Sequence, residues 1–173
     1  MNKIFILLSI MLILASCGKE KKKPVYLDLS DTSEEVLYAK SGDEIVVPFR
    51  NDNGVKYVPV KVNGTGFEMI FDTGCSGALL SVAEANYLYQ KGKLSQEDIL
   101  GTAQSQIADG SVVENMVVNL KEVVINDQIL CTDVKATVSS NINAPLLLGN
   151  EILDRIASIT IDNQNETLIF KLK

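Results

Sequence analysis

The feature that most constrains this chain is an apolar strand that ends directly on a carboxylate. Residues 69–71 (Met-Ile-Phe) lead straight into Asp72, Thr73 and Gly74. A carboxylate at the end of a buried strand is costly to desolvate unless nearby groups compensate it. Thr73 supplies a hydroxyl, and Gly74 lets the backbone turn tightly and approach closely. The fold must therefore carry a buried strand into an abrupt polar turn.

Most of the remaining chain consists of short apolar segments separated by turn sequences. Asn63-Gly64 is the strongest hairpin signal, and Asp52-Asn53-Gly54 and Asp109-Gly110 are similar. Strands are expected at residues 45–49, 55–62, 66–71, 102–108, 111–120, 123–125, 129–131, 134–139, 158–161 and 167–172. Pro59 predicts that its strand lies at an edge or contains a bulge. This pattern predicts an all-β domain of the barrel or sandwich type.

Short helical segments interrupt the strands. Ser81 with Glu84 three residues later forms a capping box, so residues 81–90 should be helical and end before Gly92. A second short turn of helix is expected from Ser95, and one or two helical turns at residues 152–156.

The first 16 residues carry the pattern of a secretory signal peptide. Lys3 precedes an apolar run that is too short to span a bilayer comfortably, and small residues lead to Cys17. This ending resembles a bacterial lipobox, which implies that Cys17 is lipidated and becomes the first mature residue, held at the membrane by several acyl chains. A simple signal peptide with an incidental cysteine, or an uncleaved anchor, remains open.

Three segments follow from this interpretation. Residues 1–16 are a lipoprotein signal peptide, residues 17–40 a polar lipidated tether, and residues 41–173 the folded domain. The expected location is the bacterial cell envelope, lipid-anchored to a membrane on its periplasmic or cell-surface side.

Composition excludes several classes of function. The net charge is −6, without a basic stripe in the folded part, so nucleic acid is not an expected partner. The chain has no histidine, which excludes Ser-His-Asp and Cys-His catalysis and histidine zinc sites. If the chain is an enzyme, its proton chemistry rests on carboxylates, with no metal or other cofactor.

Four features in sequence order resemble a retropepsin-like aspartic protease of the single-lobe bacterial type. The resemblance covers about residues 55–172. The features are the Asn63-Gly64 hairpin feeding Phe71-Asp72-Thr73-Gly74, the helix opening at Ser81, a hairpin with Ala108-Asp109-Gly110-Ser111 at its tip, and Leu147-Leu148-Gly149 followed by Asn150-Glu151-Ile152-Leu153. It implies a small closed β-barrel with one or two short helices. It also implies a catalytic turn of Asp72, Thr73 and Gly74, and a substrate-binding flap of Ala108, Asp109 and Gly110.

The chemistry of such a site needs two carboxyl groups. One activates water as a base while the other protonates the substrate carbonyl. At an effective dielectric of about 20, two like charges about 3 Å apart repel by roughly 5 kcal/mol, so the pair keeps one proton. This chain contains a single Asp-Thr-Gly. We therefore expect a two-fold homodimer that places two Asp72 side chains face to face, with an extended peptide across the axis.

Three positions depart from the family pattern. Retroviral members pair an arginine after the second-motif glycine with an acidic residue two positions after Asp-Thr-Gly, but here these positions hold Asn150 and Ser76. Cys75 occupies a place where a small residue is usual, and a thiol there is open to oxidation. An exported location permits a bond between Cys75 and Cys131, but two distant thiols do not require one.

Several features also allow interpretations that involve no catalysis by this chain. Asp72 could cap a turn in an inert barrel, and Asp109-Gly110 could be an ordinary surface hairpin. The whole chain could be a non-catalytic lipoprotein that binds a peptide or partner with the same barrel. A monomer that stays inactive until it pairs with a partner is a third possibility.

Overall fold

The structure is a computed structural model, and it describes residues 38–107 and 109–173. The predicted signal peptide, the lipidation site Cys17, most of the tether and the flap residue Ala108 lie outside the described residues. Among the residues described, no helix combines the length and apolar character needed to cross a bilayer.

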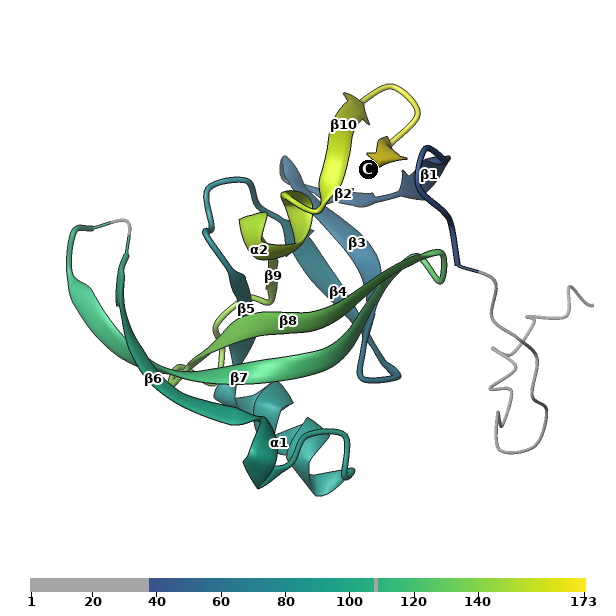
Figure 1. The fold of residues 1–173 in the computed structure, drawn as a ribbon. Coiled ribbons are helices and arrows are strands. Elements are labelled where there is room, and N and C mark those ends of the chain that lie inside the picture. The colour runs from purple at the N-terminus through teal and green to yellow at the C-terminus, as the bar shows by residue number, and fades with distance from the viewer. Residues whose placement is uncertain (1–37, 108) are drawn as a thin grey trace, which may run out of the picture. The chain divides into compact units, whose positions relative to one another are not determined.

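The described part of the chain is dominated by strands, as Figure 1 shows. The strands are β1 (Glu44–Pro48), β2 (Arg50–Asp52), β3 (Val55–Val62), β4 (Thr65–Phe71), β5 (Ala78–Ser81), β6 (Ile99–Gln106), β7 (Val112–Ile125), β8 (Ile129–Ser139), β9 (Leu147–Leu148), β10 (Ile156–Asp162) and β11 (Thr167–Leu172). The helices are α1 (Val82–Gln90), the 3₁₀ helix η1 (Gln96–Asp98) and α2 (Asn150–Leu153). This content confirms the predicted all-β class.

The larger sheet closes on itself to form a small barrel. Its strand order is β2-β3-β4-β9-β5-β8-β7-β6, and a further pairing of β3 with β7 joins the two sides. That closing pairing runs antiparallel from Val60↔Ile125 to Val62↔Val123. Closure pairs β3 with β7, so the strands left at the edges of this sheet are β2 and β6.

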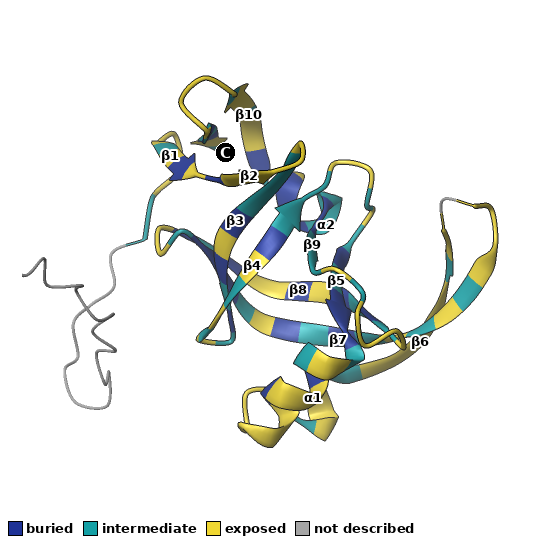
Figure 2. Ribbon diagram, turned by 180° about the vertical axis from the view of Figure 1, so that it is seen from behind, coloured by how far each residue is buried: buried dark blue, intermediate teal, exposed yellow. Residues whose placement is uncertain are grey.

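The barrel encloses the hydrophobic core. On β3 the burial alternates, with Val58, Val60 and Val62 inside and their neighbours more exposed. The other fully buried large side chains include Met69, Leu80, Leu120, Ile125 and Leu148. Figure 2 shows these buried positions in dark blue along the inner strands, while α1 and the far part of the β6–β7 hairpin are mainly exposed.

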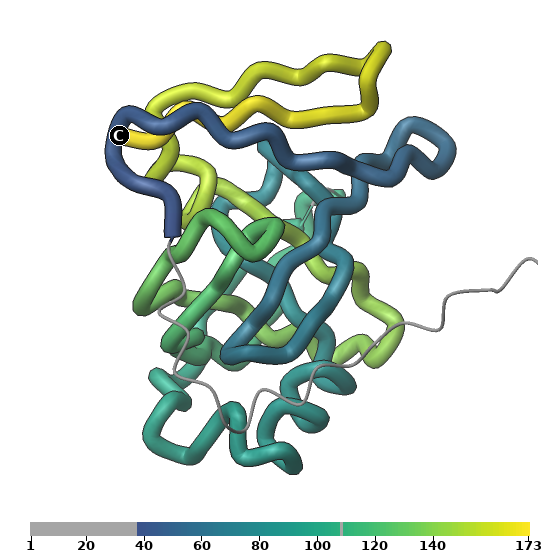
Figure 3. The backbone as a smooth tube through the Cα atoms, turned by 90° about the vertical axis from the view of Figure 1, so that its right-hand side faces the viewer, coloured from purple at the N-terminus to yellow at the C-terminus, as the bar shows by residue number. Residues whose placement is uncertain are grey.

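A separate three-stranded sheet, in the order β1-β11-β10, lies at one end of the barrel, and α1 lies at the other (Figure 3). Val47, Leu168 and Phe170 of this sheet are fully buried and belong to the same core. The two ends of the described chain are thereby tied to the barrel through apolar contacts.

The expected edge position or bulge at Pro59 is wrong. β3 lies between other strands, but it changes partner near the proline: β2 pairs with residues 55–57, and β7 pairs with residues 60–62. The Pro59 carbonyl accepts a hydrogen bond from the Asn126 amide at 2.9 Å, from the turn that follows β7. The proline therefore occupies the gap between two partners, where a missing N–H costs little.

Two expected pairs of strands are each one long strand. Residues 111–120 and 123–125 join in the 14-residue β7, and residues 129–131 and 134–139 join in the 11-residue β8. The ladder passes from Leu120↔Val134 to Glu122↔Thr132, and Asp133 takes a positive φ of 51° at this point. The register is the same on both sides of this point, so one position of the ladder is left without a pair and no residue is inserted into either strand.

Helix α1 begins as predicted. The Ser81 hydroxyl accepts hydrogen bonds from the amides of Ala83 (3.1 Å) and Glu84 (3.4 Å). The Glu84 carboxylate also contacts that hydroxyl. The helix ends at Gln90, and Gly92 follows with a positive φ of 66°.

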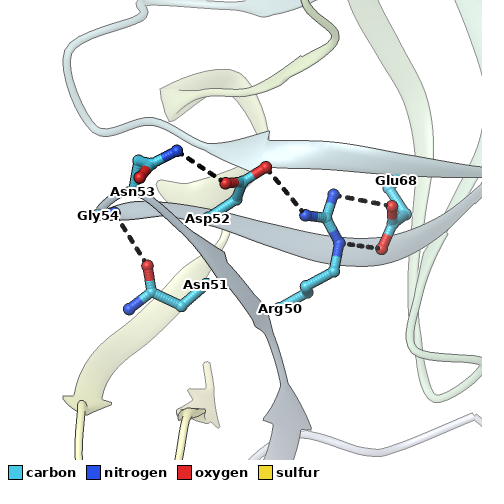
Figure 4. Close-up of polar contacts among 6 residues, drawn as sticks. All are labelled: Arg50, Asn51, Asp52, Asn53, Gly54 and Glu68. Carbon is cyan, nitrogen blue, oxygen red and sulfur yellow. Dashed lines mark hydrogen bonds and ion pairs between the residues drawn. The ribbon is translucent and has the colours of Figure 1, made fainter.

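Polar contacts on the barrel surface fasten the short strand β2. Arg50 donates to Glu68 of β4 at 3.1 Å and to Asp52 at 3.4 Å. Figure 4 shows both contacts as dashed lines. The guanidinium also stacks over Tyr57 of β3, 4.2 Å from the ring centroid. Arg50 thus bridges three neighbouring strands, with about half of its side chain exposed to solvent.

Candidate active site

Asp72 lies where β4 leaves the barrel. β4 pairs in parallel with the two-residue strand β9, in the register Ile70↔Leu147 and Phe71↔Leu148. The Asp72 amide continues this ladder by donating to the Leu148 carbonyl at 3.2 Å. The expectation of an apolar strand leading into a polar turn is confirmed, and β9 is the element that holds the end of that strand.

The Asp72 carboxylate is bound by its own turn. Its Oδ1 accepts a hydrogen bond from the Gly74 amide at 2.8 Å, and the Cys75 amide donates to the Asp72 carbonyl at 3.3 Å. A β-carbon added at Gly74 would lie 3.1 Å from the same Oδ1, which is closer than ordinary contact. Glycine at this position therefore lets the peptide approach the carboxylate. The carboxylate stays partly open to solvent, and Thr73 is exposed beside it.

The first turn of α2 holds the other side of this turn. The amides of Asn150 and Glu151 donate to the carbonyls of Cys75 (2.9 Å) and Ser76 (3.1 Å). The Asn150 side chain adds a third bond, from Nδ2 to the Thr73 carbonyl at 3.1 Å. In the sequence, Asn150 is notable only as the position where retroviral members have an arginine. In the structure its neutral side-chain amide contacts the turn directly. The sequence feature that could have indicated this contact is the position of Asn150 directly after Gly149.

Gly149 separates β9 from α2 and has no room for a side chain. A β-carbon at this position would lie 2.0 Å from the Gly77 carbonyl oxygen and 2.6 Å from that of Cys75. Both atoms belong to the backbone, so rotation of a side chain cannot relieve the contact. The glycine of the Leu147-Leu148-Gly149 segment is therefore needed for the close packing of α2 beneath the Asp72 turn.

Cys75 points back into the turn. Its thiol donates to the Gly77 carbonyl at 3.1 Å, and both Cys75 and Cys131 are free. Burial raises the pKa of the Cys75 thiol, and the nearby Asp72 charge raises it further, while the bond to Gly77 acts in the opposite direction. A raised pKa leaves less thiolate at neutral pH, so this cysteine is less reactive than its position suggested.

Asp109 and Gly110 of the predicted flap lie at the tip of the long β6–β7 hairpin. The Ile107 amide donates to the Ser111 carbonyl at 2.9 Å, and the Ser111 amide donates to Asp109 Oδ1 at 2.8 Å. Hydrogen bonds from Ser111 lower the pKa of Asp109, and Gly110 supplies the positive φ of 85° that the turn needs. Figure 1 shows the hairpin as an arm that extends beyond the barrel. The structure therefore keeps Asp72, Thr73 and Gly74 in one turn and carries Asp109 and Gly110 on a separate element.

The comparisons with known proteins agree with this geometry. A family model described as gag-polyprotein putative aspartyl protease matches residues 58–155, a range that includes the Asp72 turn, the β6–β7 hairpin and α2. No curated protein matches the chain. Among solved structures, a retropepsin-like aspartic protease from Rickettsia conorii is 24% identical with a TM-score of 0.52, over 74% of this chain and 89% of that one.

The similarity to the Rickettsia conorii structure supports the fold, and the family model supports membership. The chain therefore belongs to the gag-polyprotein putative aspartyl protease family and has the retropepsin-like fold.

Proposed function

We propose that this protein is a membrane-anchored aspartic endopeptidase that is active as a homodimer. The observation that carries the proposal is the state of Asp72. Its carboxylate is held by the Gly74 amide in a turn that α2 clamps from behind, yet it remains partly open to solvent. A carboxylate that only capped a turn would need neither a glycine at residue 74 to bring the peptide close to it nor contacts from α2 to hold its turn in place.

The need for a second copy follows from the sequence and the reaction. The chain contains one Asp-Thr-Gly, while water activation and carbonyl protonation require two adjacent carboxyl groups. In the proposed dimer, one Asp72 carboxylate takes a proton from the attacking water, and the protonated Asp72 of the second copy donates its proton to the substrate carbonyl oxygen. Collapse of the resulting gem-diol breaks the C–N bond: the protonated Asp72 gives its proton to the leaving amine, and the ionised Asp72 takes a hydroxyl proton of the gem-diol, which restores one proton on the pair.

The β6–β7 hairpin would close over an extended peptide. Its tip contains Gly110 at positive φ and a short network between Asp109 and Ser111, so it can keep its shape while the arm moves as a unit. Lids of this kind exclude water from the reacting groups. Lipid attachment at Cys17 would confine protomers to one surface and raise their effective concentration.

Replacement of Asp72 by Asn tests the enzyme. We expect peptide cleavage to be lost with the unfolding midpoint retained, since the amide keeps the shape and an oxygen that the Gly74 N–H can reach. Asp162→Asn is the matched control, because Asp162 also accepts backbone amides in its own turn, at 3.0 Å from Gln164 and Asn165. Cleavage that survives Asp72→Asn would exclude this mechanism. A wild-type protein that binds peptides without cutting them would support the non-catalytic binding lipoprotein instead.

Mixing wild-type and Asp72→Asn subunits tests the shared site. If both copies supply a carboxyl, equal mixing should lower the activity per wild-type subunit to about half, since half of the wild-type subunits then face an inactive partner. Activity that is independent of mixing would exclude the homodimer. For the anchor, Cys17→Ser should abolish the incorporation of a labelled fatty acid into the protein, and labelling that persists in this variant would contradict lipidation at Cys17.

A further inference from the structure

The peptide group between Thr73 and Gly74 is held at both of its polar atoms. Its carbonyl oxygen accepts from Asn150 Nδ2 at 3.1 Å. Its N–H, on Gly74, donates to Asp72 Oδ1 at 2.8 Å. The Asn150 amide, one peptide group and the Asp72 carboxylate therefore form a continuous chain of hydrogen bonds.

Hydrogen bonds in such a chain polarise one another. A donor on the carbonyl oxygen draws electron density from the peptide and makes its N–H a stronger donor to the carboxylate. The same donor prevents the peptide from rotating, which fixes the direction from which the Gly74 N–H meets Asp72. Fixed donors of this kind act on a reacting group without reorganising during the reaction.

Asn150 is itself well anchored. Its backbone amide donates to the Cys75 carbonyl at 2.9 Å, and its carbonyl accepts from the Asp154 amide at 2.8 Å. Arg155 binds α2 to β8 by contacting the carbonyls of Thr132, Asp133 and Glu151. The donor on the Thr73 carbonyl thus belongs to an element that is fixed to the barrel wall.

We propose that Asn150 is a positioning residue for the Asp72 carboxylate, acting through the Thr73–Gly74 peptide. The expected effect of Asn150 on kcat rests on the proposed protease function, but its expected effect on the Gly74 amide does not. The residue needs to be a neutral donor at this position. An aspartate would suit the start of a helix equally well, but it would place an acceptor against the Thr73 carbonyl.

The difference between asparagine, which can donate to the Thr73 carbonyl, and aspartate, which cannot, supplies the test. The test variants are Asn150→Asp and Asn150→Ala, and the control is Asn86→Asp on the exposed face of α1. The first measurement is of the Gly74 amide proton, which is observed by NMR in the full chain. We expect its resonance to move upfield and its hydrogen exchange to accelerate in both Asn150 variants, and to stay unchanged in Asn86→Asp. A Gly74 amide that is unaffected in Asn150→Asp overturns the proposal.

The second readout is kinetic. We expect kcat on a peptide substrate to fall about five- to tenfold in Asn150→Ala and further in Asn150→Asp, as the loss of one net hydrogen bond implies, with KM nearly unchanged and the protein still folded at the assay temperature. A purely structural role at the start of α2 would instead leave Asn150→Asp close to wild type, and that result overturns the proposal. If Asp72→Asn shows that the protein is no protease, the NMR result still decides whether Asn150 controls the Gly74 amide. If Asn150→Ala does not fold, the isosteric Asn150→Asp carries the test.

Discussion

Gly149 lies against the Gly77 carbonyl so closely that a β-carbon on residue 149 would be 2.0 Å from that oxygen. Two backbone segments that are 72 positions apart in the chain thus touch without intervening side chains. This contact places the start of α2 under the Asp72 turn, where its amides and the Asn150 side chain reach three carbonyls of that turn.

Gly149→Ala should be strongly destabilising. The added methyl meets two backbone oxygens, so the turn or α2 has to move, and we expect a loss of about 3 kcal/mol or more in the free energy of unfolding. Gly77→Ala is the matched control, because a β-carbon at Gly77 meets nothing within 4 Å and its φ is not in the left-handed region. Equal denaturant midpoints for the two variants would contradict the packing described here.

Arg155 should contribute more to the free energy of unfolding than Arg50, although both side chains make several contacts. Arg155 satisfies three backbone carbonyls and the Glu151 carboxylate, and about a third of its side chain is exposed. We expect Arg155→Ala to lower the free energy of unfolding by about 1–3 kcal/mol, with lysine unable to restore the forked contacts.

Arg50→Ala provides the comparison. Its partners Asp52 and Glu68 are more than half exposed, and such pairs contribute less than about 1 kcal/mol. Urea unfolding of both variants would decide the order, and an Arg50→Ala effect larger than that of Arg155→Ala would contradict it.

The sequence was sufficient to predict the local elements whose signals are local. Asn63-Gly64 forms the expected hairpin with φ of 46° and 78°, which only a few residue types adopt readily. Ser81 caps α1 as its spacing with Glu84 suggested. Short-range hydrogen bonds decide these features, so they can be read from a few adjacent residues.

Features that depend on distant partners could not be predicted in the same way. Pro59 disfavours a central strand, yet β3 is central because its neighbour changes from β2 to β7 at that residue. The expected break between residues 120 and 123 is absent, because the β7–β8 ladder continues in one register from Leu120↔Val134 to Glu122↔Thr132. The contact of Asn150 with Thr73 depends on the pairing of β9 with β4. Because β9 is only two residues long, its sequence does not indicate which strand it pairs with.

Cys75 should react slowly with alkylating agents. Burial raises the pKa of its thiol, and so does the Asp72 charge, so the reactive thiolate is scarce at neutral pH. We expect iodoacetamide to modify Cys75 more slowly than a free cysteine at pH 7, and the rate to rise steeply as pH increases. Asp72→Asn should increase the rate, since it removes the negative charge. Mass spectrometry of timed samples measures each site, and rapid labelling of Cys75 at pH 7 would contradict a raised pKa of this partly buried thiol.

Asp98 should make the stability of the domain sensitive to acid. Only 5% of it is exposed, and burial alone would raise its pKa, but hydrogen bonds from Ser95 and the ion pair with Lys121 at 3.3 Å lower the pKa below its usual range. Because the native pKa is below that of the unfolded chain, the unfolded state binds more protons as the pH falls. The stabilisation is therefore complete above the unfolded value of about 3.9 and is lost as the pH falls through the native pKa.

Asp98→Asn should accordingly be less stable than wild type at pH 7, and the difference should shrink as the pH drops below about 4. Glu97→Gln is the control, because Glu97 is exposed on the same helical turn. Thermal unfolding across this range measures the difference at each pH. A constant gap between wild type and Asp98→Asn would mean that the contacts of Asp98 with Ser95 and Lys121 do not favour its charged form.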